Sequence, residues 1–263
     1  MKLKEVLVHR PNIEIHSMEK NFEKFSWKEM PKLDKLQKEH DTLIESLREE
    51  GIKINYTLKT LESKPNLVFI RDPAFILDGK ALILRLTSIR QGEELLVKER
   101  IFQLGIKIFG QLIYPSILEG SNIFLIDEKI ALIGLDERGN LYGVSKFKEI
   151  FKIETHPITQ EKIRENFNII NKTAVISEDV IDSQLYYFLK ENEFDIILAS
   201  KKESEEGAVE FLQVSENKLI NFKSSLNKKL EKNGFDVIEL DLKEFMKSLR
   251  GIKSLVLPLD YGI

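Results

Sequence analysis

The chain has 263 residues, of which 42% are hydrophobic and 32% are charged. This composition can supply a hydrophobic core and a charged surface, so it excludes an intrinsically disordered protein. Its formal net charge is −3, and no Lys/Arg cluster recurs along one face, so we expect neither a nucleic-acid nor a membrane partner. Without an N-terminal apolar segment or an apolar run of membrane-spanning length, we expect a cytoplasmic protein.

The chain contains no cysteine, which removes disulfides, thiolate metal sites and cysteine nucleophiles together. Its histidines are scattered and show no metal-binding spacing (His9, His16, His40 and His156). Neither a GxGxxG nor a P-loop pattern is present. We therefore expect no metal and no cofactor. Abundant Ile, Lys and Glu without cysteine favour a thermophilic source.

Several expected helices end in the same way, with an amphipathic tail, a glycine or polar stop, and the start of a strand. This pattern occurs at residues 46–54, 101–108, 187–197 and 230–240, with a weaker copy at 144–156. In the first copy Leu36, Leu43 and Leu47 share one helical face, and Gly51 suits the left-handed position after the helix. The spacing of about 40–55 residues indicates a repeated unit.

Hairpins are expected between these helices. One turns at Asp78-Gly79, and others turn near residues 127–128, 171–172 and 216–217. Each unit is then two strands, a helix and a third strand. The first unit is split, because "KEVLVHRP" at the start and "SLVLPL" at the end of the sequence can pair with each other. That pairing closes the array, and it predicts a single domain over residues 1–263 in which five ββαβ units surround a central channel.

Charged residues stand at the ends of these hairpins, where loops of different units would converge. "FIRDPAF" places Arg71 and Asp72 in an otherwise apolar strand, "ILEGSNIF" places Glu119 before another, and "GLDERGN" places Arg138 after that hairpin. Because unpaired buried charges are costly, these residues either form internal salt bridges, such as Arg71 with Glu119, or bind a charged ligand. Two carboxylates suit a guanidinium, which donates in bidentate fashion, and an arginine suits an α-carboxylate.

Six stretches in this order resemble the guanidino-group-modifying (pentein) superfamily, which includes arginine deiminases, dimethylarginine dimethylaminohydrolases and amidinotransferases. The stretches are "VLVHRP", "FIRDPAF", "SIRQGEE", "LEGSN", "GLDERGN" and "RGIKSLVLPL". The resemblance implies an α/β fold, the five-bladed α/β propeller. This is the same closed ring that the repeats predict.

The resemblance also implies roles for individual residues. Asp72 and Glu119 would bind a guanidinium, while Arg90 and Arg138 would bind the carboxylate end of an amino-acid ligand such as arginine. Ser254 stands at the position of the family's nucleophilic cysteine. The family's Gly-Asp after the glutamate and glycine is replaced by Ser-Asn at residues 121–122.

The family's general acid/base histidine also has no direct counterpart. Aligning "KIRENFN" with the family's His-Leu-Asp element puts Lys162 in the histidine position and Arg164 in the aspartate position. His156 lies a few residues upstream, from where a shifted loop could supply it. A protonated lysine is a poor base, and a serine hydroxyl becomes nucleophilic only beside a good one. We therefore expect the standard thiol reaction to be impaired. The missing histidine also argues against an engineered Cys→Ser exchange at Ser254.

Three interpretations of function remain. The first is a non-catalytic relative that binds arginine or a similar guanidino compound. The second is an active enzyme in which Ser254 is the nucleophile and Lys162, Lys253 or His156 the base. The third is a structural or interaction protein whose charges form internal bridges. The resemblance also implies a homodimer as a candidate assembly, because dimers occur in the family.

Overall fold

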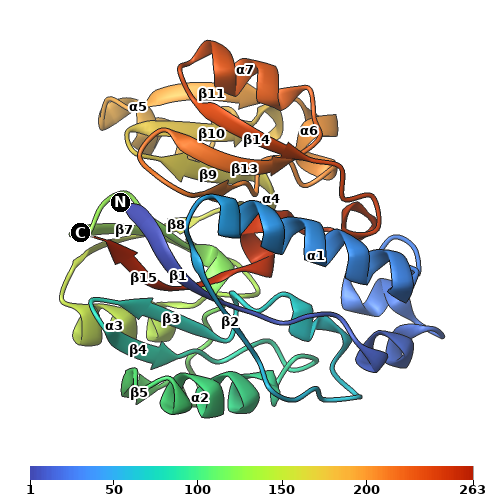
Figure 1. Ribbon diagram of the computed structural model, residues 1–263. Helices are drawn as coiled ribbons and strands as arrows, with labels where there is room; N and C mark the ends of the chain where they lie inside the picture. Colours follow the sequence, from blue (N-terminus) through green and yellow to red (C-terminus); the bar gives the residue numbers. More distant parts are fainter. Residues whose placement is uncertain (263) are drawn as a thin grey trace.

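The computed structural model describes residues 1–262, which form five three-stranded sheets in the strand orders β15-β1-β2, β3-β4-β5, β6-β7-β8, β11-β10-β9 and β12-β13-β14 (Figure 1). The first eight strands are β1 (Lys2–Val8), β2 (Lys53–Tyr56), β3 (Ala74–Leu77), β4 (Lys80–Ile83), β5 (Lys107–Gln111), β6 (Ile123–Leu125), β7 (Ile130–Leu135) and β8 (Glu154–Thr159). The others are β9 (Phe167–Ile170), β10 (Thr173–Ser177), β11 (Asp195–Ala199), β12 (Leu212–Gln213), β13 (Lys218–Phe222), β14 (Asp236–Leu240) and β15 (Leu257–Gly262).

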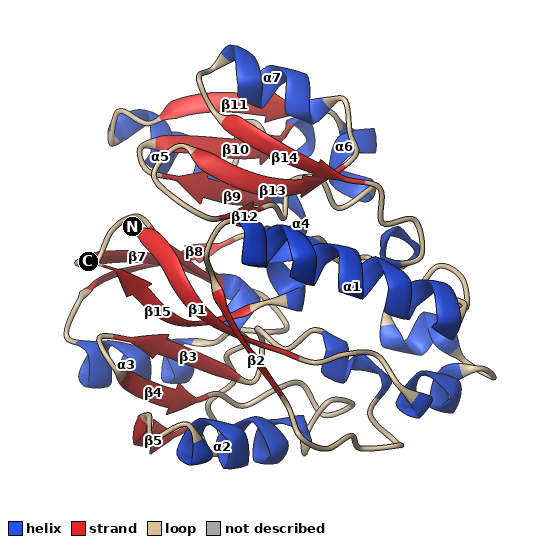
Figure 2. Cartoon of the chain, in the orientation of Figure 1, coloured by secondary structure: helices blue, strands red, loops and turns tan. Residues whose placement is uncertain are grey.

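Each sheet contains one antiparallel pair of strands, which is a hairpin in every sheet except β15-β1-β2, and one parallel strand that follows a helix, which confirms the predicted ββαβ unit. Figure 2 shows most of the helices around the outside of the sheets. The helices are α1 (Leu33–Glu49), α2 (Glu93–Gln103), α3 (Leu141–Phe151), α4 (Ile163–Asn166), α5 (Gln184–Glu191), α6 (Lys201–Glu205) and α7 (Leu226–Lys232). The short helices α4 and α6 are additions to the repeated pattern.

The first unit is split between the two ends of the sequence, as predicted. β1 pairs antiparallel with β15, with Leu7 opposite Leu257, and parallel with β2, with Leu7 opposite Asn55. Figure 1 shows the blue β1 beside the red β15. This pairing builds the sheet β15-β1-β2 from both ends of the sequence and closes the ring.

Local sequence signals account for the hairpins and the helix faces. Asp78 and Gly79 both have positive φ, 50° and 67°, which is the conformation that a two-residue hairpin turn requires. Leu36, Leu43 and Leu47 of α1 are fully buried and belong to the core that this helix forms with its sheet. Gly51, with φ 74°, follows that helix in the left-handed conformation.

One local expectation is wrong, because Arg71 and Asp72 do not lie within a strand. Residues 65–68 form a 3₁₀ turn, the Asp72 amide donates to the Phe69 carbonyl at 3.4 Å, and β3 begins only at Ala74. Pro73, which has no N–H to donate, separates the turn from the strand. The loop places Asp72 at the inner end of the hairpin.

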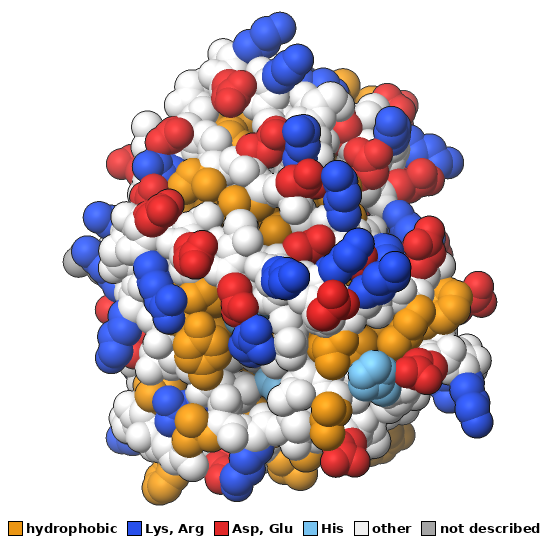
Figure 3. Space-filling model, turned by 45° about the vertical axis from the view of Figure 1, so that its right-hand side comes forward, with side chains coloured by type: hydrophobic (Ala, Val, Ile, Leu, Met, Phe, Trp, Pro, Cys, Tyr) orange, Lys and Arg blue, Asp and Glu red, His pale blue; other side chains and the backbone are white. Residues whose placement is uncertain are grey.

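The surface carries both signs of charge. On the face in Figure 3, Lys and Arg side chains are interspersed with Asp and Glu side chains. Within residues 1–262, no helix combines the length and the apolar character that crossing a membrane requires.

Candidate functional site

Asp72 and Glu119 lie together at the centre of the ring, and both are 0% exposed. Asp72 precedes β3, and Glu119 precedes a short 3₁₀ turn, Gly120–Asn122, that leads into β6. The Gly120 amide donates to the Asp72 carbonyl at 3.1 Å, and the Ser121 amide donates to Asp72 Oδ1 at 3.0 Å. A Cβ at Gly120 would lie 2.2 Å from the Arg71 carbonyl oxygen, so this approach of the two loops requires glycine.

A guanidinium of the chain itself spans the two acids. Arg250 Nη1 donates to Asp72 Oδ2 at 2.6 Å, and Arg250 Nη2 lies 3.8 Å from Glu119 Oε2. The Arg250 guanidinium also lies 5.0 Å from the ring centroid of Phe69. Burial, followed by the charge of Arg164, lowers the pKa of Arg250 to about 10. No sequence pattern indicated a role for Arg250.

Arg90 is buried beside Arg250 and is held from several sides. It pairs with Asp72 Oδ2 and with Glu93 Oε2, the latter at 2.6 Å, and it donates to the carbonyls of Asn66 and Phe69, both at 3.2 Å. Burial alone would raise the pKa of Asp72, but Arg250 and Arg90 outweigh it and hold that pKa below its ordinary value. The assignment of Arg90 to a ligand carboxylate stays a prediction.

Glu119 uses its two oxygens differently. Oε1 accepts from the amide and the hydroxyl of Thr87, at 3.1 and 2.9 Å. Oε2 accepts no hydrogen bond within residues 1–262, although four guanidinium groups lie 3.6–3.8 Å away (Arg90, Arg138, Arg164 and Arg250). A buried carboxylate oxygen without a donor is an open acceptor at the centre of the ring.

Arg138 lies at the edge of this cluster, just after β7. Its side chain keeps 14% exposure, its Nε lies 3.6 Å from Glu119 Oε2, and its Nη1 pairs with Glu137. Arg138 is therefore the most exposed of the four arginines around Glu119.

Lys162 and Arg164, which align with the family's acid/base element, differ in their burial. Lys162 is exposed, with φ 51°, directly before α4, while Arg164 in α4 is buried and reaches the centre. Arg164 Nη1 lies 3.7 Å from Glu119 Oε2, and Arg164 Nε lies 3.9 Å from Glu210 Oε1. His156 lies in β8, where it pairs with Glu154 at 2.7 Å. The structure thus brings Arg164 to the acids, and places Lys162 at the surface.

Ser254 is 0% exposed and lies in a 3₁₀ turn, Ile252–Leu255, just before β15. Its hydroxyl donates to Glu210 Oε2 at 2.6 Å and lies 3.4 Å from the Ser121 hydroxyl. Burial raises the pKa of Glu210 above its ordinary value, although Arg164 and Arg250 oppose the shift. The hydrogen-bonding partner of Ser254 is therefore a buried carboxyl group.

Sequence reasoning missed Glu210, although a signal was present. Glu210 stands two residues before β12 in "AVEFLQV", just as Asp72 stands two residues before β3 in "IRDPAFIL". The expectation that functional charged residues stand where the hairpins begin, extended to this unit, would have identified Glu210 as a third central acid. Among residues 1–262, no group of three or more His, Cys, Asp or Glu side chains is arranged to hold a metal.

Comparison with known proteins gives the same architecture over nearly the whole chain. A Cys→Ser variant of dimethylarginine dimethylaminohydrolase from Pseudomonas aeruginosa, solved with citrulline, superposes with a TM-score of 0.82 at 20% identity and covers 98% of this chain and 99% of its own. The N-terminal domain of ArgZ, an arginine dihydrolase of cyanobacteria solved with its product, gives a TM-score of 0.84 at 18% identity, covering 99% of this chain and 98% of that one. These likenesses show the fold.

Sequence comparison adds relatives and a family. The chain is 27% identical to the uncharacterized protein YkgA of Bacillus subtilis over 235 residues, which is 85% of this chain and 80% of YkgA. It is 42% identical to arginine deiminase of Streptococcus pyogenes over 64 residues, which is 24% of this chain and 15% of that enzyme. The model of the family described as N,N dimethylarginine dimethylhydrolase, eukaryotic, matches residues 12–253. The chain therefore belongs to this family, within the guanidino-group-modifying superfamily.

Proposed function

We propose that this chain is a guanidinium-recognition protein of the family that has lost the thiol reaction, and that Arg250 takes the place of the ligand when none is bound. The observation that carries the proposal is the position of the Arg250 guanidinium, 2.6 Å from Asp72 and 3.8 Å from Glu119, over the ring of Phe69. Two carboxylates and an aromatic face are the partners that a free guanidino compound would use.

The charges of the cluster make displacement of Arg250 the route by which such a ligand would bind. Asp72 already pairs with Arg90 and Arg250, and Arg164 also lies near Glu119. A further cation would add repulsion at a site that already lowers the pKa of Arg250. A ligand that replaces Arg250 keeps the charge unchanged, and the open acceptor Glu119 Oε2 can receive one of its N–H groups.

An attached side chain competes strongly with a free ligand because its effective concentration is high. We therefore expect arginine, agmatine or methylated arginines to bind the wild-type protein weakly, in the millimolar range or above. Arg250→Ala should bind them at least tenfold more tightly, measured by isothermal titration calorimetry. Arg10→Ala is the matched control, because Arg10 forms an exposed pair with Asp41.

Circular dichroism first checks that Arg250→Ala is folded. The proposal fails if the folded variant binds none of these compounds, even at ligand concentrations tenfold higher than those used with the wild type. If Arg250→Ala does not fold, Arg250→Lys serves instead, since lysine keeps the charge but lacks the planar fork. The arginine derivatives should then bind Arg250→Lys more tightly than the wild type.

A second candidate function is a reaction that uses Ser254, and the 2.6 Å bond from its hydroxyl to Glu210 favours it. In this reaction Ser254 Oγ would attack the guanidinium carbon of a ligand that has displaced Arg250, and the hydroxyl proton would pass to Glu210. The C–N bond to ammonia or a methylated amine would then break as Glu210 returns the proton to the leaving nitrogen. Attack of water on the resulting O-alkylisourea would release citrulline and restore the Ser254 hydroxyl. Glu210 Oε2 already accepts the hydrogen bond from this hydroxyl, which places it to receive the proton, and burial raises the pKa of Glu210 above its ordinary value. Formation of citrulline or ornithine that disappears in both Ser254→Ala and Glu210→Gln would support this function, and no product after long incubation would reject it.

A further inference from the structure

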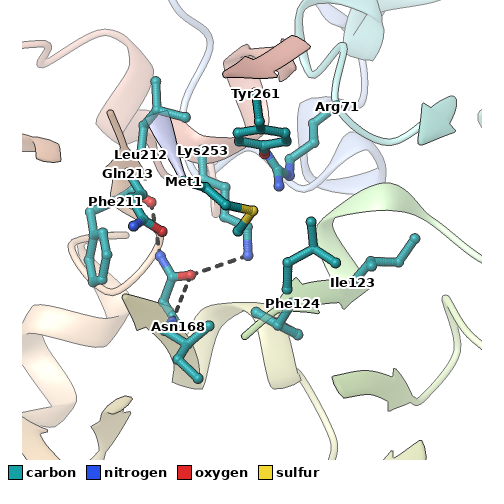
Figure 4. Close-up of a pocket in the computed structure, with 12 residues that line it drawn as sticks. Met1, Arg71, Ile123, Phe124, Asn168, Phe211, Leu212, Gln213, Lys253 and Tyr261 are labelled. Carbon is teal, nitrogen blue, oxygen red and sulfur yellow. Dashed lines mark hydrogen bonds between the residues drawn. The ribbon is translucent and has the colours of Figure 1, made fainter. Parts of the chain in front are cut away.

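A cavity lies on the strand side of the charged cluster. It measures about 40 Å³ and is bordered by Phe124 of β6, Asn168 of β9 and Tyr261 of β15, together with Arg71 and Lys253 (Figure 4). The strands β6, β9 and β15 follow the segments that hold Glu119, Arg164 and Ser254, so the cavity lies on the side of these residues toward which the strands run. Neither the proposed binding of a guanidino compound nor the serine reaction uses it.

Lys253 brings a buried amine to this cavity. The residue is 6% exposed, its Nζ lies 3.9 Å from the ring centroid of Phe124, and it donates to Asn168 Oδ1 at 3.3 Å. Figure 4 shows the amine directed into the cavity, with this bond as a dashed line. Burial and then the charge of Arg71 lower the pKa of Lys253 well below its ordinary value, against the opposing effects of Glu210 and Asp72.

Arg71 supplies a second cationic group to the same space. Its Nε is buried without a hydrogen-bond partner in residues 1–262, and within these residues its guanidinium makes no ion pair of 4 Å or less. None of the described residues that line the cavity is an aspartate or a glutamate. The expected partnership of Arg71 with Glu119 is therefore absent, because Arg71 lines this cavity and Glu119 is surrounded by other arginines.

We propose that this cavity binds a small monoanion of the size of chloride or formate between Arg71 and Lys253. Two basic side chains converge there, none of the described residues that line the cavity is acidic, and an anion would pair with both. The volume is suitable, since a single water needs about 10–15 Å³ of such space. A planar carboxylate such as formate would accept from Arg71 in bidentate fashion, whereas chloride would bind as a point charge.

The proposal predicts that a bound anion raises the pKa of Lys253, because a neighbouring negative charge stabilises the charged amine. Binding of the anion should therefore take up protons from the buffer, which calorimetry detects as a heat that changes with the ionisation enthalpy of the buffer. The test titrates sodium formate and sodium chloride separately into the full chain, with sodium sulfate as a larger dianion that should not fit. Binding of either monoanion supports the proposal, and the two titrations identify which chemistry the cavity prefers.

The variant for the test is Lys253→Met, which keeps the length of the side chain and removes the amine. We expect it to lose at least tenfold in anion affinity, together with the proton uptake. Lys146→Met is the matched control, because the Lys146 side chain is 55% exposed, and it should bind like the wild type. Arg71→Met gives a second variant with the same expected loss, should Lys253→Met not fold. Equal anion binding by wild type and both cavity variants, or none by the wild type, would overturn the proposal.

Discussion

Arg250 and Asp72, far apart in the sequence, form a hydrogen-bonded ion pair of 2.6 Å at the centre of the ring. Both residues are buried, and the acid also holds Arg90. In a family that acts on guanidino groups, a guanidinium supplied by the chain itself lies between the acids. The fold thus holds one of its own guanidinium groups between Asp72 and Glu119.

The first prediction concerns the stability that Asp72 provides. Asp72→Asn leaves Arg90 and Arg250 buried without their shared counter-charge, which should lower the free energy of unfolding by about 3–5 kcal/mol. Urea unfolding followed by circular dichroism measures this. Asp41→Asn, which removes an exposed partner of Arg10, should cost about 0–1 kcal/mol. Similar losses in the two variants would show that the central ion pairs contribute no more than a surface pair.

The second prediction follows from the buried carboxyl group of Glu210. Its pKa is raised in the folded protein above the ordinary value of 4.5, so the folded state holds the proton more tightly than the unfolded state. The stability gained from this proton is complete below pH 4.5 and is lost as the pH rises through the folded pKa. Glu210→Gln imitates the protonated form and still accepts from Ser254.

Unfolding measured between pH 4 and pH 8 tests this prediction. Relative to Glu210→Gln, the wild type should lose stability as the pH rises above about 4.5. Other titrating groups are common to both proteins and cancel in the difference. A difference that stays constant across this range would show that Glu210 titrates normally in the folded protein.

The third prediction concerns His40, a buried histidine of α1 whose ring nitrogens have no hydrogen-bond partner in residues 1–262. Burial lowers the pKa of His40 from 6.5 to about 4. Its neutral form therefore supports the fold fully above pH 6.5, and this support is lost as the pH falls from 6.5 towards 4, by up to about 1.4 kcal/mol per pH unit.

His40→Leu should remove this part of the acid sensitivity, whereas His16→Gln should leave it unchanged, because the His16 side chain is 54% exposed. The free energy of unfolding at pH 7 and pH 5 gives the comparison. The prediction is wrong if His40→Leu loses as much stability between these two pH values as the wild type does.

The fourth prediction tests whether Ser254 alone limits the family reaction. We expect Ser254→Cys to form no citrulline from arginine or methylated arginines, because under the proposed function Arg250 still occupies the position that the guanidinium of the ligand would take. The nearby carboxyl group of Glu210 would also disfavour a thiolate. A colorimetric citrulline assay, with Ser254→Ala as background, measures the outcome. Turnover above that background would show that a cysteine is all that the site lacks.

The sequence predicts the architecture well because each unit carries strong local signals. The Asp78-Gly79 turn, the apolar face of α1 and the glycine that ends it all occur where the pattern places them. The split first unit follows from two strands that would otherwise have no partner, and the register of β1 with β15 confirms it.

The centre of the ring was less predictable because it depends on which charges meet across distant loops. Arg250 lies in a loop whose letters, "LRGIK", resemble those of an exposed turn. Only the convergence of Asp72 and Glu119 makes it a buried residue. In α4 the choice between Lys162 and Arg164 depends on the positive φ of Lys162, and no residue type in "KIRENFN" indicates that conformation.

The pairing of β1 with β15 has a consequence for biosynthesis. Lys2 stands opposite Gly262, so β1 is synthesised long before β15, the strand that completes its sheet. Until β15 has been synthesised, one edge of β1 is open to other chains, and such long-range pairing is intrinsically slow. This sheet can therefore be completed only after the segment that contains Arg250 and Ser254 has also been synthesised.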